Sequence, residues 1–228
     1  MIHQSAYISL FIQFITGIIH FNATKIEVPK DKEIYKELLD LELKVQIIEF
    51  IYYLWLVNNF SSNKDITYTR YFDWMITTPT MLLTLIAYLD LSNTENSDNP
   101  KNLNSVIKSN KDIIIKVFVL NFIMLIFGLC GELKILDTKT AVGLGFIPFV
   151  LYFKLIYNKF ITKNTTTLQI KMYGFFVIIW SLYGVAALLP YYQKNTMYNI
   201  LDLFAKNFFG VVLVYTVWKN KKKLQIYV

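Results

Sequence analysis

Apolar residues gather into seven stretches, each long enough to cross a lipid bilayer, and short polar segments separate them. A helix that spans the hydrocarbon core needs about 20 predominantly apolar residues. The stretches are Ser5–Phe21, Lys36–Phe60, Thr69–Leu91, Asp112–Gly131, Thr138–Asn158, Leu168–Pro190 and Met197–Trp218. The pattern predicts an all-α membrane protein: one seven-helix bundle formed by a single domain, residues 1–228. The second stretch is the weakest, because it carries Glu42, Lys44 and Glu49.

Composition supports a membrane protein and excludes several other classes. The chain is 55% hydrophobic and only 17% charged, whereas soluble domains are about 45–50% apolar and about 25% charged. A soluble enzyme, a disordered chain and a disulfide scaffold are therefore disfavoured, and the single cysteine allows no intrachain disulfide. The first stretch follows Met1 without a positively charged segment, so we expect a retained helix and no cleaved signal peptide.

The net charge of +7 comes almost entirely from lysine, with Arg70 as the single arginine. If the N-terminus lies outside, most lysines fall in the inner connections and the C-terminal tail. The outer side then holds only Lys64, Arg70, Lys134, Lys139 and Lys194. This asymmetry follows the positive-inside rule and places the C-terminus in the cytoplasm. The basic residues thus indicate a multi-pass protein whose partner is the lipid bilayer, and they do not indicate nucleic acid.

Lys206 lies near the middle of the seventh stretch, where a charged lysine costs about 2.5–3.5 kcal/mol on insertion scales. Asp202 precedes it by one helical turn, and a second intramembrane carboxylate, Asp73, lies in the third stretch. One interpretation is a structural ion pair between helices. The other is a lysine consumed in a Schiff base, whose cation needs counter-ions in a dry pocket.

Three motifs resemble the microbial (type I) rhodopsins, and the resemblance extends over all seven stretches. They are RYFDWMITTP at residues 70–79, WSLY at 180–183 and DLFAK at 202–206. The resemblance implies that Lys206 binds all-trans retinal as a covalent protonated Schiff base. It also implies a counter-ion and proton-acceptor group, in which Thr77 hydrogen-bonds the Asp73 carboxylate. That group consists of Asp73, Asp202, Arg70 and Thr77.

The same resemblance implies a retinal pocket with aromatic walls. Its residues besides Lys206 are Trp74, Thr78, Met124, Gly128, Trp180 and Tyr183. Asn121 also matches the family's spacing near the ring end. Simpler interpretations remain, since Trp180 and Tyr183 could be ordinary core residues and the two threonines could bond their own helix carbonyls. Gly184 and Ala187 stand where the family often has proline and tryptophan, which leaves the pocket shape open.

Further polar residues lie within the first, second and seventh stretches, at positions that share helix faces. They are Ser9, Gln13, Glu42, Glu49, Asn199 and Asn207. Intramembrane carboxylates normally face a bundle interior or a wet cavity, so these residues predict a hydrated ion pathway beside Lys206. Negatively charged pathways favour cations. The alternatives are interhelical hydrogen bonding and, for Glu42, a position at the inner interface.

The set as a whole resembles the light-gated cation channels among the viral rhodopsins of large algal viruses. We therefore predict a photoreceptor, not an enzyme and with no metal, that conducts monovalent cations or protons. A weak outward proton pump is the alternative, although Thr84 stands where a proton donor would be. The expected outer loop, residues 191–195, also lacks carboxylates for proton release. A photosensor acting through a partner is the third. Oligomeric state, including a homo-oligomer, is open.

Overall fold

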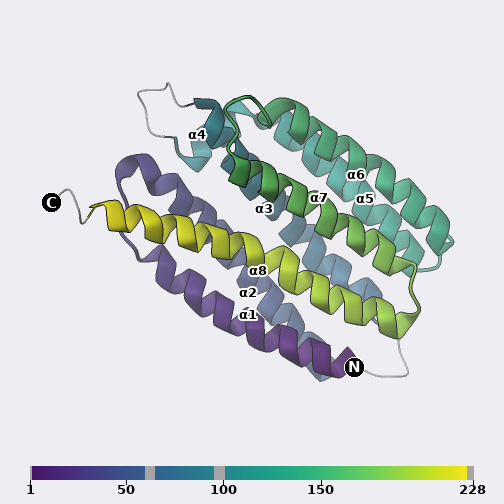
Figure 1. Ribbon diagram of the computed structural model, residues 1–228. Helices are drawn as coiled ribbons and strands as arrows, with labels where there is room; N and C mark the ends of the chain where they lie inside the picture. The colour runs from purple at the N-terminus through teal and green to yellow at the C-terminus, as the bar shows by residue number, and fades with distance from the viewer. Residues whose placement is uncertain (1, 60–64, 95–100, 225–228) are drawn as a thin grey trace.

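The computed structural model describes residues 2–59, 65–94 and 101–224, and this part of the chain contains only helices and connecting segments. Seven long helices lie side by side, and one short helix, α4, covers part of one end (Figure 1). The α-helices are α1 Ile2–Thr24, α2 Glu33–Asn59, α3 Arg70–Asp90, α4 Leu103–Ser109, α5 Lys111–Glu132, α6 Thr138–Phe160, α7 Thr167–Ala187 and α8 Tyr191–Leu224. Short 3-10 turns occupy Lys30–Lys32, Thr67–Thr69 and Leu91–Thr94.

The seven predicted spans are present, and their ends differ from the prediction by a few residues, except at the C-terminal helix. That helix begins at Tyr191, so residues 191–195 form its first turns and are not the outer loop that we expected. The loop between α3 and α5 contains α4, which Asn102 caps by accepting a hydrogen bond from the Ser105 amide at 2.8 Å. Part of that loop, Phe60 and Lys64 lie outside the described residues.

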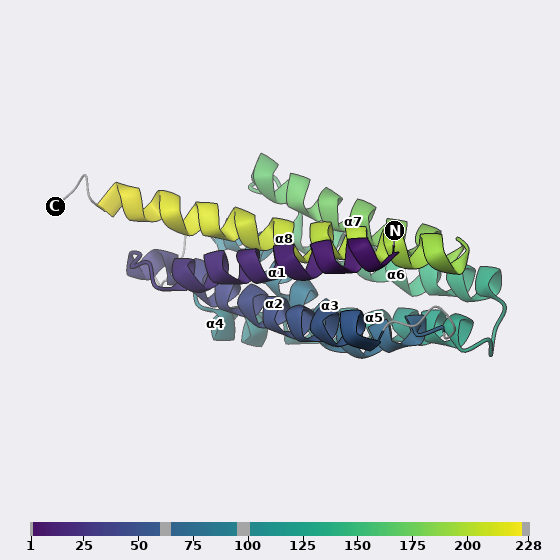
Figure 2. The ribbon, with the colours of Figure 1, turned by 90° about the horizontal axis from the view of Figure 1, so that it is seen from below.

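The helices form a closed ring of neighbours around a shared interior. α1 packs against α2 and α8, α3 packs against α2 and α5, and α5, α6 and α7 complete the ring to α8. Figure 2 shows the same bundle turned by 90°, with the helices still running along one common direction. The start of α1 and the end of α8 lie toward opposite ends of the bundle (Figure 1), as an odd number of spans requires.

Polar and apolar side chains are distributed in the reverse of the usual soluble pattern. Phe11 and Phe72 are 65% and 69% exposed, whereas Gln13, Glu49 and Asp202 have no exposed surface. Such an arrangement suits a protein surrounded by lipid, where polar groups must find partners inside. Within the described residues, six helices are long and apolar enough to cross a membrane. The helix α2 falls short because it carries several charged residues, among them the buried Glu42 and Glu49.

Local sequence signals determine several helix ends near the site-bearing helices. Thr166 and Gln169 form a reciprocal capping box at the start of α7, which satisfies amides that the first turn leaves free. In the α5–α6 turn, Lys134 adopts a positive φ of 59°. Gly131 allows the two helices to approach, because a Cβ there would lie 2.7 Å from the Cβ of Ala141.

Candidate functional site

Lys206 on α8 is 2% exposed and is surrounded by carboxylates from three helices. Its Nζ contacts Glu49 Oε2 of α2 and Asp73 Oδ2 of α3 directly, and Asp202 Oδ1 of its own helix lies 4.0 Å away. The sequence analysis expected both aspartates beside the lysine. It assigned Glu49 only to an ion pathway, but the structure brings that carboxylate closer to Lys206 than Asp202 is.

Arg70 is the second buried cation of this cluster and is 1% exposed. Its Nη1 donates to Asp202 Oδ2 at 3.1 Å, and its Nη2 donates to Asn199 Oδ1 at 2.5 Å. Two tyrosine hydroxyls also donate to Asp202, from Tyr53 at 2.8 Å and from Tyr183 at 2.6 Å. Asp202 is thus bound mainly by Arg70 and the tyrosines, which leaves Glu49 and Asp73 for Lys206. With every group ionised, three carboxylates would face two cations.

The two threonines of the α3 motif bond mainly to their own helix. Thr77 donates to the backbone carbonyl of Asp73 at 3.0 Å. Because a hydroxyl has a single hydrogen to donate, this bond competes with the expected one from Thr77 to the Asp73 carboxylate. Thr78 donates to the carbonyl of Trp74 at 2.7 Å and accepts from Asn121 Nδ2 at 2.8 Å. Thr78 therefore links α3 to α5.

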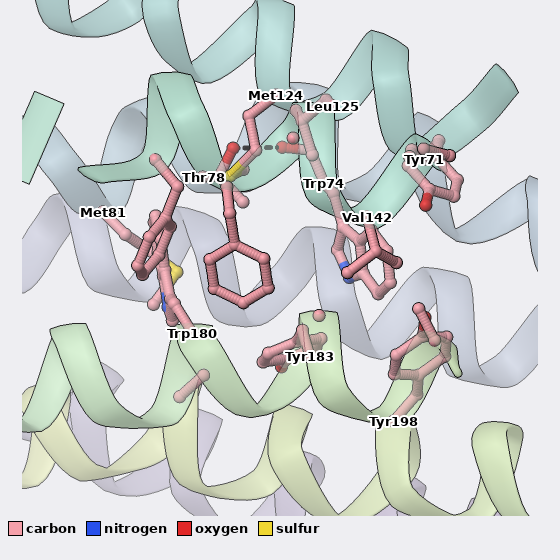
Figure 3. Close-up of a pocket in the computed structure, with 18 of the residues that line it drawn as sticks. Tyr71, Trp74, Thr78, Met81, Met124, Leu125, Val142, Trp180, Tyr183 and Tyr198 are labelled. Atoms are coloured by element: carbon pink, nitrogen blue, oxygen red, sulfur yellow. Dashed lines mark hydrogen bonds between the residues drawn. The ribbon is translucent and has the colours of Figure 1, made fainter. Parts of the chain in front are cut away.

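A cavity opens beside Lys206, between residues of α3, α5, α6, α7 and α8 (Figure 3). All seven residues expected around retinal line it: Lys206, Trp74, Thr78, Met124, Gly128, Trp180 and Tyr183. Trp74 meets Tyr183 edge-on, with ring centroids 5.4 Å apart. The sequence analysis missed further lining residues, including Tyr71, Met81, Phe146, Phe149 and Tyr198. Their contribution depends on which helices are neighbours, which no spacing in the sequence reveals.

Glycines fix the outline of this cavity at two points. A Cβ at Gly128 would lie 2.5 Å from the Tyr71 hydroxyl, and one at Gly184 would lie 2.6 Å from the Phe146 ring. Gly184 is the position where the family often has proline, and here the Phe146 ring takes the space that a side chain would need. The lining is mainly aromatic and aliphatic around a single amine. This chemistry fits a flat apolar polyene attached through a lysine.

The six residues expected along an ion pathway are all buried, with exposures of 0% except 7% for Asn207. Ser9 donates to the Asn199 carbonyl at 3.0 Å, and Gln13 donates to Glu49 Oε1 at 3.1 Å. Glu42 has no exposed surface. We call the polar residues shared by α1, α2 and α8 the seam: Ser9, Gln13, Thr16, His20, Glu42, Gln46, Glu49, Asn199 and Asn207.

The sequence analysis missed two α2 residues that complete this arrangement, Gln46 and Tyr53. The Gln46 amide donates to the Gln13 carbonyl at 3.2 Å, and Tyr53 bonds Asp202 as described. Both were detectable, because Glu42, Gln46, Glu49 and Tyr53 recur at steps of four, three and four residues. That spacing puts them on one helix face.

An ion pair at the outer end of the bundle was also missed. Lys194 Nζ lies 2.6 Å from Glu132 Oε2, and both side chains are largely buried. It joins α5 to α8. The sequence analysis placed Lys194 in an outer loop without a partner. Only the tertiary packing brings together two residues 62 positions apart.

Comparisons with known proteins agree with this geometry. The family model of bacteriorhodopsin-like proteins matches residues 2–220. A crystal structure of the viral rhodopsin OLPVRII is similar at 27% identity and a TM-score of 0.80, covering 96% of this chain and 98% of that one. No curated protein sequence matches the chain.

Two further solved structures share the fold at lower identity. The blue light-absorbing proteorhodopsin from Med12 is 20% identical, with a TM-score of 0.74, covering 97% of this chain and 98% of that one. The proton pumping rhodopsin AR2 from the marine alga Acetabularia acetabulum is 19% identical, with a TM-score of 0.71 and 96% of each chain covered. The family binds retinal through a lysine Schiff base and consists of multi-pass membrane proteins. The chain therefore belongs to the bacteriorhodopsin-like family of retinal-binding membrane proteins.

Proposed function

We propose that this protein is a light-gated cation channel whose retinal is attached to Lys206. The observation that carries the channel proposal is the seam. Two carboxylates, Glu42 and Glu49, and several amides are buried along α1, α2 and α8, and they reach Lys206 through Glu49. Polar groups inside a membrane protein are expensive and typically mark an ion or proton route. The acidic character of this route favours cations.

Bound retinal would supply light absorption and the change of shape from all-trans to 13-cis. The chain's own residues would do the remainder. Trp74, Trp180 and Tyr183 exclude water from the cavity, and Asp73 is in contact with the lysine nitrogen as the group that receives its proton. The net acidic cluster of Glu49, Asp73 and Asp202 stabilises a cation at Lys206. Loss of one charge from this cluster would weaken the contacts that hold α2, α3 and α8 together.

Passive conduction requires the seam to open on both sides of Lys206. On the outer side, Arg70 closes it by bonding Asp202, Asn195 and Asn199. Close to Lys206, Glu49 closes it by its contacts with the lysine and Gln13. We propose that light separates these contacts, so that hydrated monovalent cations move down their gradient.

A weak outward proton pump is the second candidate, and the contact between Asp73 and Lys206 favours it. A pump needs that acceptor and a separate donor on the inner side. Thr84 on α3, at the position where such a donor would be expected, has no ionisable group. Asp73 can therefore accept the proton of Lys206, but this step alone does not produce repeated net transport of protons.

Pigment formation tests the common premise. All-trans retinal added to the expressed protein should produce a visible absorption band, which Lys206→Ala should abolish. Lys194→Ala is a matched control, because it removes another largely buried lysine of α8 that lies away from the cavity. A band that survives Lys206→Ala would refute the attachment site.

Whole-cell recording under illumination separates channel from pump. A channel gives currents whose reversal potential follows the Na⁺ or K⁺ gradient, and Glu49→Gln should change their size or selectivity. Glu132→Gln, which neutralises a buried acid outside the seam, should leave selectivity unchanged. Outward current that persists against every applied gradient would establish the pump instead.

A further inference from the structure

His20 is a buried titratable group that the proposed function does not use. It lies on α1 and has no exposed surface. Neither ring nitrogen has a hydrogen-bond partner among the described residues. Its imidazole lies directly against the backbone of Gly210 on α8, so closely that any Cβ at position 210 would overlap the ring.

The position of His20 places it on the inner continuation of the seam. Gly210 follows Lys206 by one helical turn, and His20 follows Gln13 by seven residues, which is about 10 Å along a helix. Gln13 is bonded to Gln46, and Glu42 precedes Gln46 by one turn on the antiparallel α2. Glu42 therefore lies about 6 Å and His20 about 10 Å from the Gln13–Gln46 bond toward the inner end, both beyond the Lys206 cluster.

Several polar atoms of this inner region lack hydrogen-bond partners within the described part of the chain. They belong to both His20 nitrogens, both Glu42 carboxylate oxygens and Gln46 Oε1. An unsatisfied buried polar group is costly, and each one in a native structure has a cause, such as a catalytic role or a bound water or ion. The concentration of these atoms in one short segment of the seam indicates a site where protons or water are handled.

Beyond His20 the interior becomes apolar toward the inner end. Ala23, Leu38, Leu213 and Val217 are at most 4% exposed and belong to one hydrophobic cluster. His20 is the last fully buried polar side chain of α1 before this apolar layer. Buried titratable residues on the helices that pack against α1 are Glu42, Glu49 and Tyr53 on α2, and Lys194, Tyr198, Asp202 and Lys206 on α8.

We propose that His20 is a proton-transfer residue that connects the inner end of the bundle to the seam beside Lys206. This inference rests on the proposed retinal attachment at Lys206. The imidazole takes a proton from the inner side on its free nitrogen and releases the proton of its other nitrogen toward Glu42 and Gln46. Exchange of the two tautomers restores the starting state, so no net charge remains. Histidine suits this task because its ordinary pKa, about 6.5, is close to neutral pH.

The test is flash photolysis of the purified, retinal-loaded full chain between about pH 5 and 8.5. The rate at which the dark absorption band returns reports how quickly the Lys206 cluster regains its proton. His20→Gln should slow this return by about tenfold or more, since general acid–base catalysis contributes roughly 10²–10⁴-fold. The variant should also lose a pH inflection in the histidine range. Added imidazole should restore part of the rate. His3→Gln is the matched control, because the chain has only two histidines.

Each alternative result is decisive. An unchanged rate and pH profile in His20→Gln would overturn the proposal. A slower return with an unchanged profile and no response to imidazole would show that His20 acts only through packing. If His20→Gln forms no pigment, the smaller His20→Asn replaces it. A return rate that does not depend on pH in the unmodified protein would refute the proposal independently. Failure to detect light-gated current would refute the channel without affecting this readout.

Discussion

Tyr53 provides a quantitative test of how the buried cluster is held together. Its hydroxyl donates to Asp202 Oδ2 at 2.8 Å, and Arg70 Nη1 donates to the Tyr53 hydroxyl oxygen at 3.4 Å. Tyr53→Phe removes the hydroxyl and keeps the fully buried ring, so the apolar packing of α2 against α8 is preserved. The change removes the hydrogen bond to the Asp202 carboxylate, together with the longer contacts of the same hydroxyl with Arg70 and with Asn199 Oδ1, the latter at 3.1 Å.

The magnitude follows from the partners that remain. After the substitution, Asp202 still accepts from Arg70 at 3.1 Å and from Tyr183 at 2.6 Å, so no buried charge loses all its partners. The cost should be that of one hydrogen bond to a charged group, about 1.5–3 kcal/mol. It should stay below the roughly 3–5 kcal/mol of breaking a buried ion pair. For a chain of this size it corresponds to a midpoint lowered by about 3–12 °C.

The assay is loss of the visible band during heating at a fixed scan rate. Tyr52→Phe is the control, because the hydrogen-bond partner of this neighbouring hydroxyl is the uncharged Thr69 hydroxyl, at 3.3 Å, and its loss should cost clearly less. An unchanged midpoint in Tyr53→Phe, or equal losses in both variants, would refute the assignment of Tyr53 to the Asp202 cluster.

Three further predictions concern the lysine cluster and the connections. Asp73→Asn should shift the visible band to the red more than Asp202→Asn does, because Asp73 contacts Lys206 whereas Asp202 lies 4.0 Å away and is paired with Arg70; equal shifts in absorption spectra would contradict this. Lys134→Gly should stabilise the protein by about 1 kcal/mol, because it relieves a left-handed backbone conformation, and a lower thermal midpoint would count against it. Hydrogen bonds from the Thr140 side chain and amide hold the pKa of Asp137 below its ordinary value, so its contribution to stability is present above that ordinary value and lost as the pH falls through the lowered one. In Asp137→Asn, thermal midpoints measured against pH should lose this acid-side component, and an unchanged acid-side slope would argue against the cap.

The sequence by itself determined the class of fold and most of the residues around the lysine. Seven apolar stretches have to become helices in a bilayer, because backbone groups there need partners within their own segment. Lys206 was conspicuous for the same reason, since a charge in the hydrocarbon region is costly. The motifs at residues 70–79 and 202–206 then located Asp73 and Asp202. Each motif is a pattern within one helix, so it can be recognised without knowing how the helices pack.

Only the tertiary structure decided which groups from different helices meet. Glu49 contacts Lys206, Tyr53 bonds Asp202, Lys194 pairs with Glu132, and His20 lies on Gly210; none of these contacts follows from spacing along one helix. Periodicity shows which face of a helix is polar, but it does not show the rotation, depth and neighbour against which that face packs. Those quantities depend on how all seven helices fill one interior together.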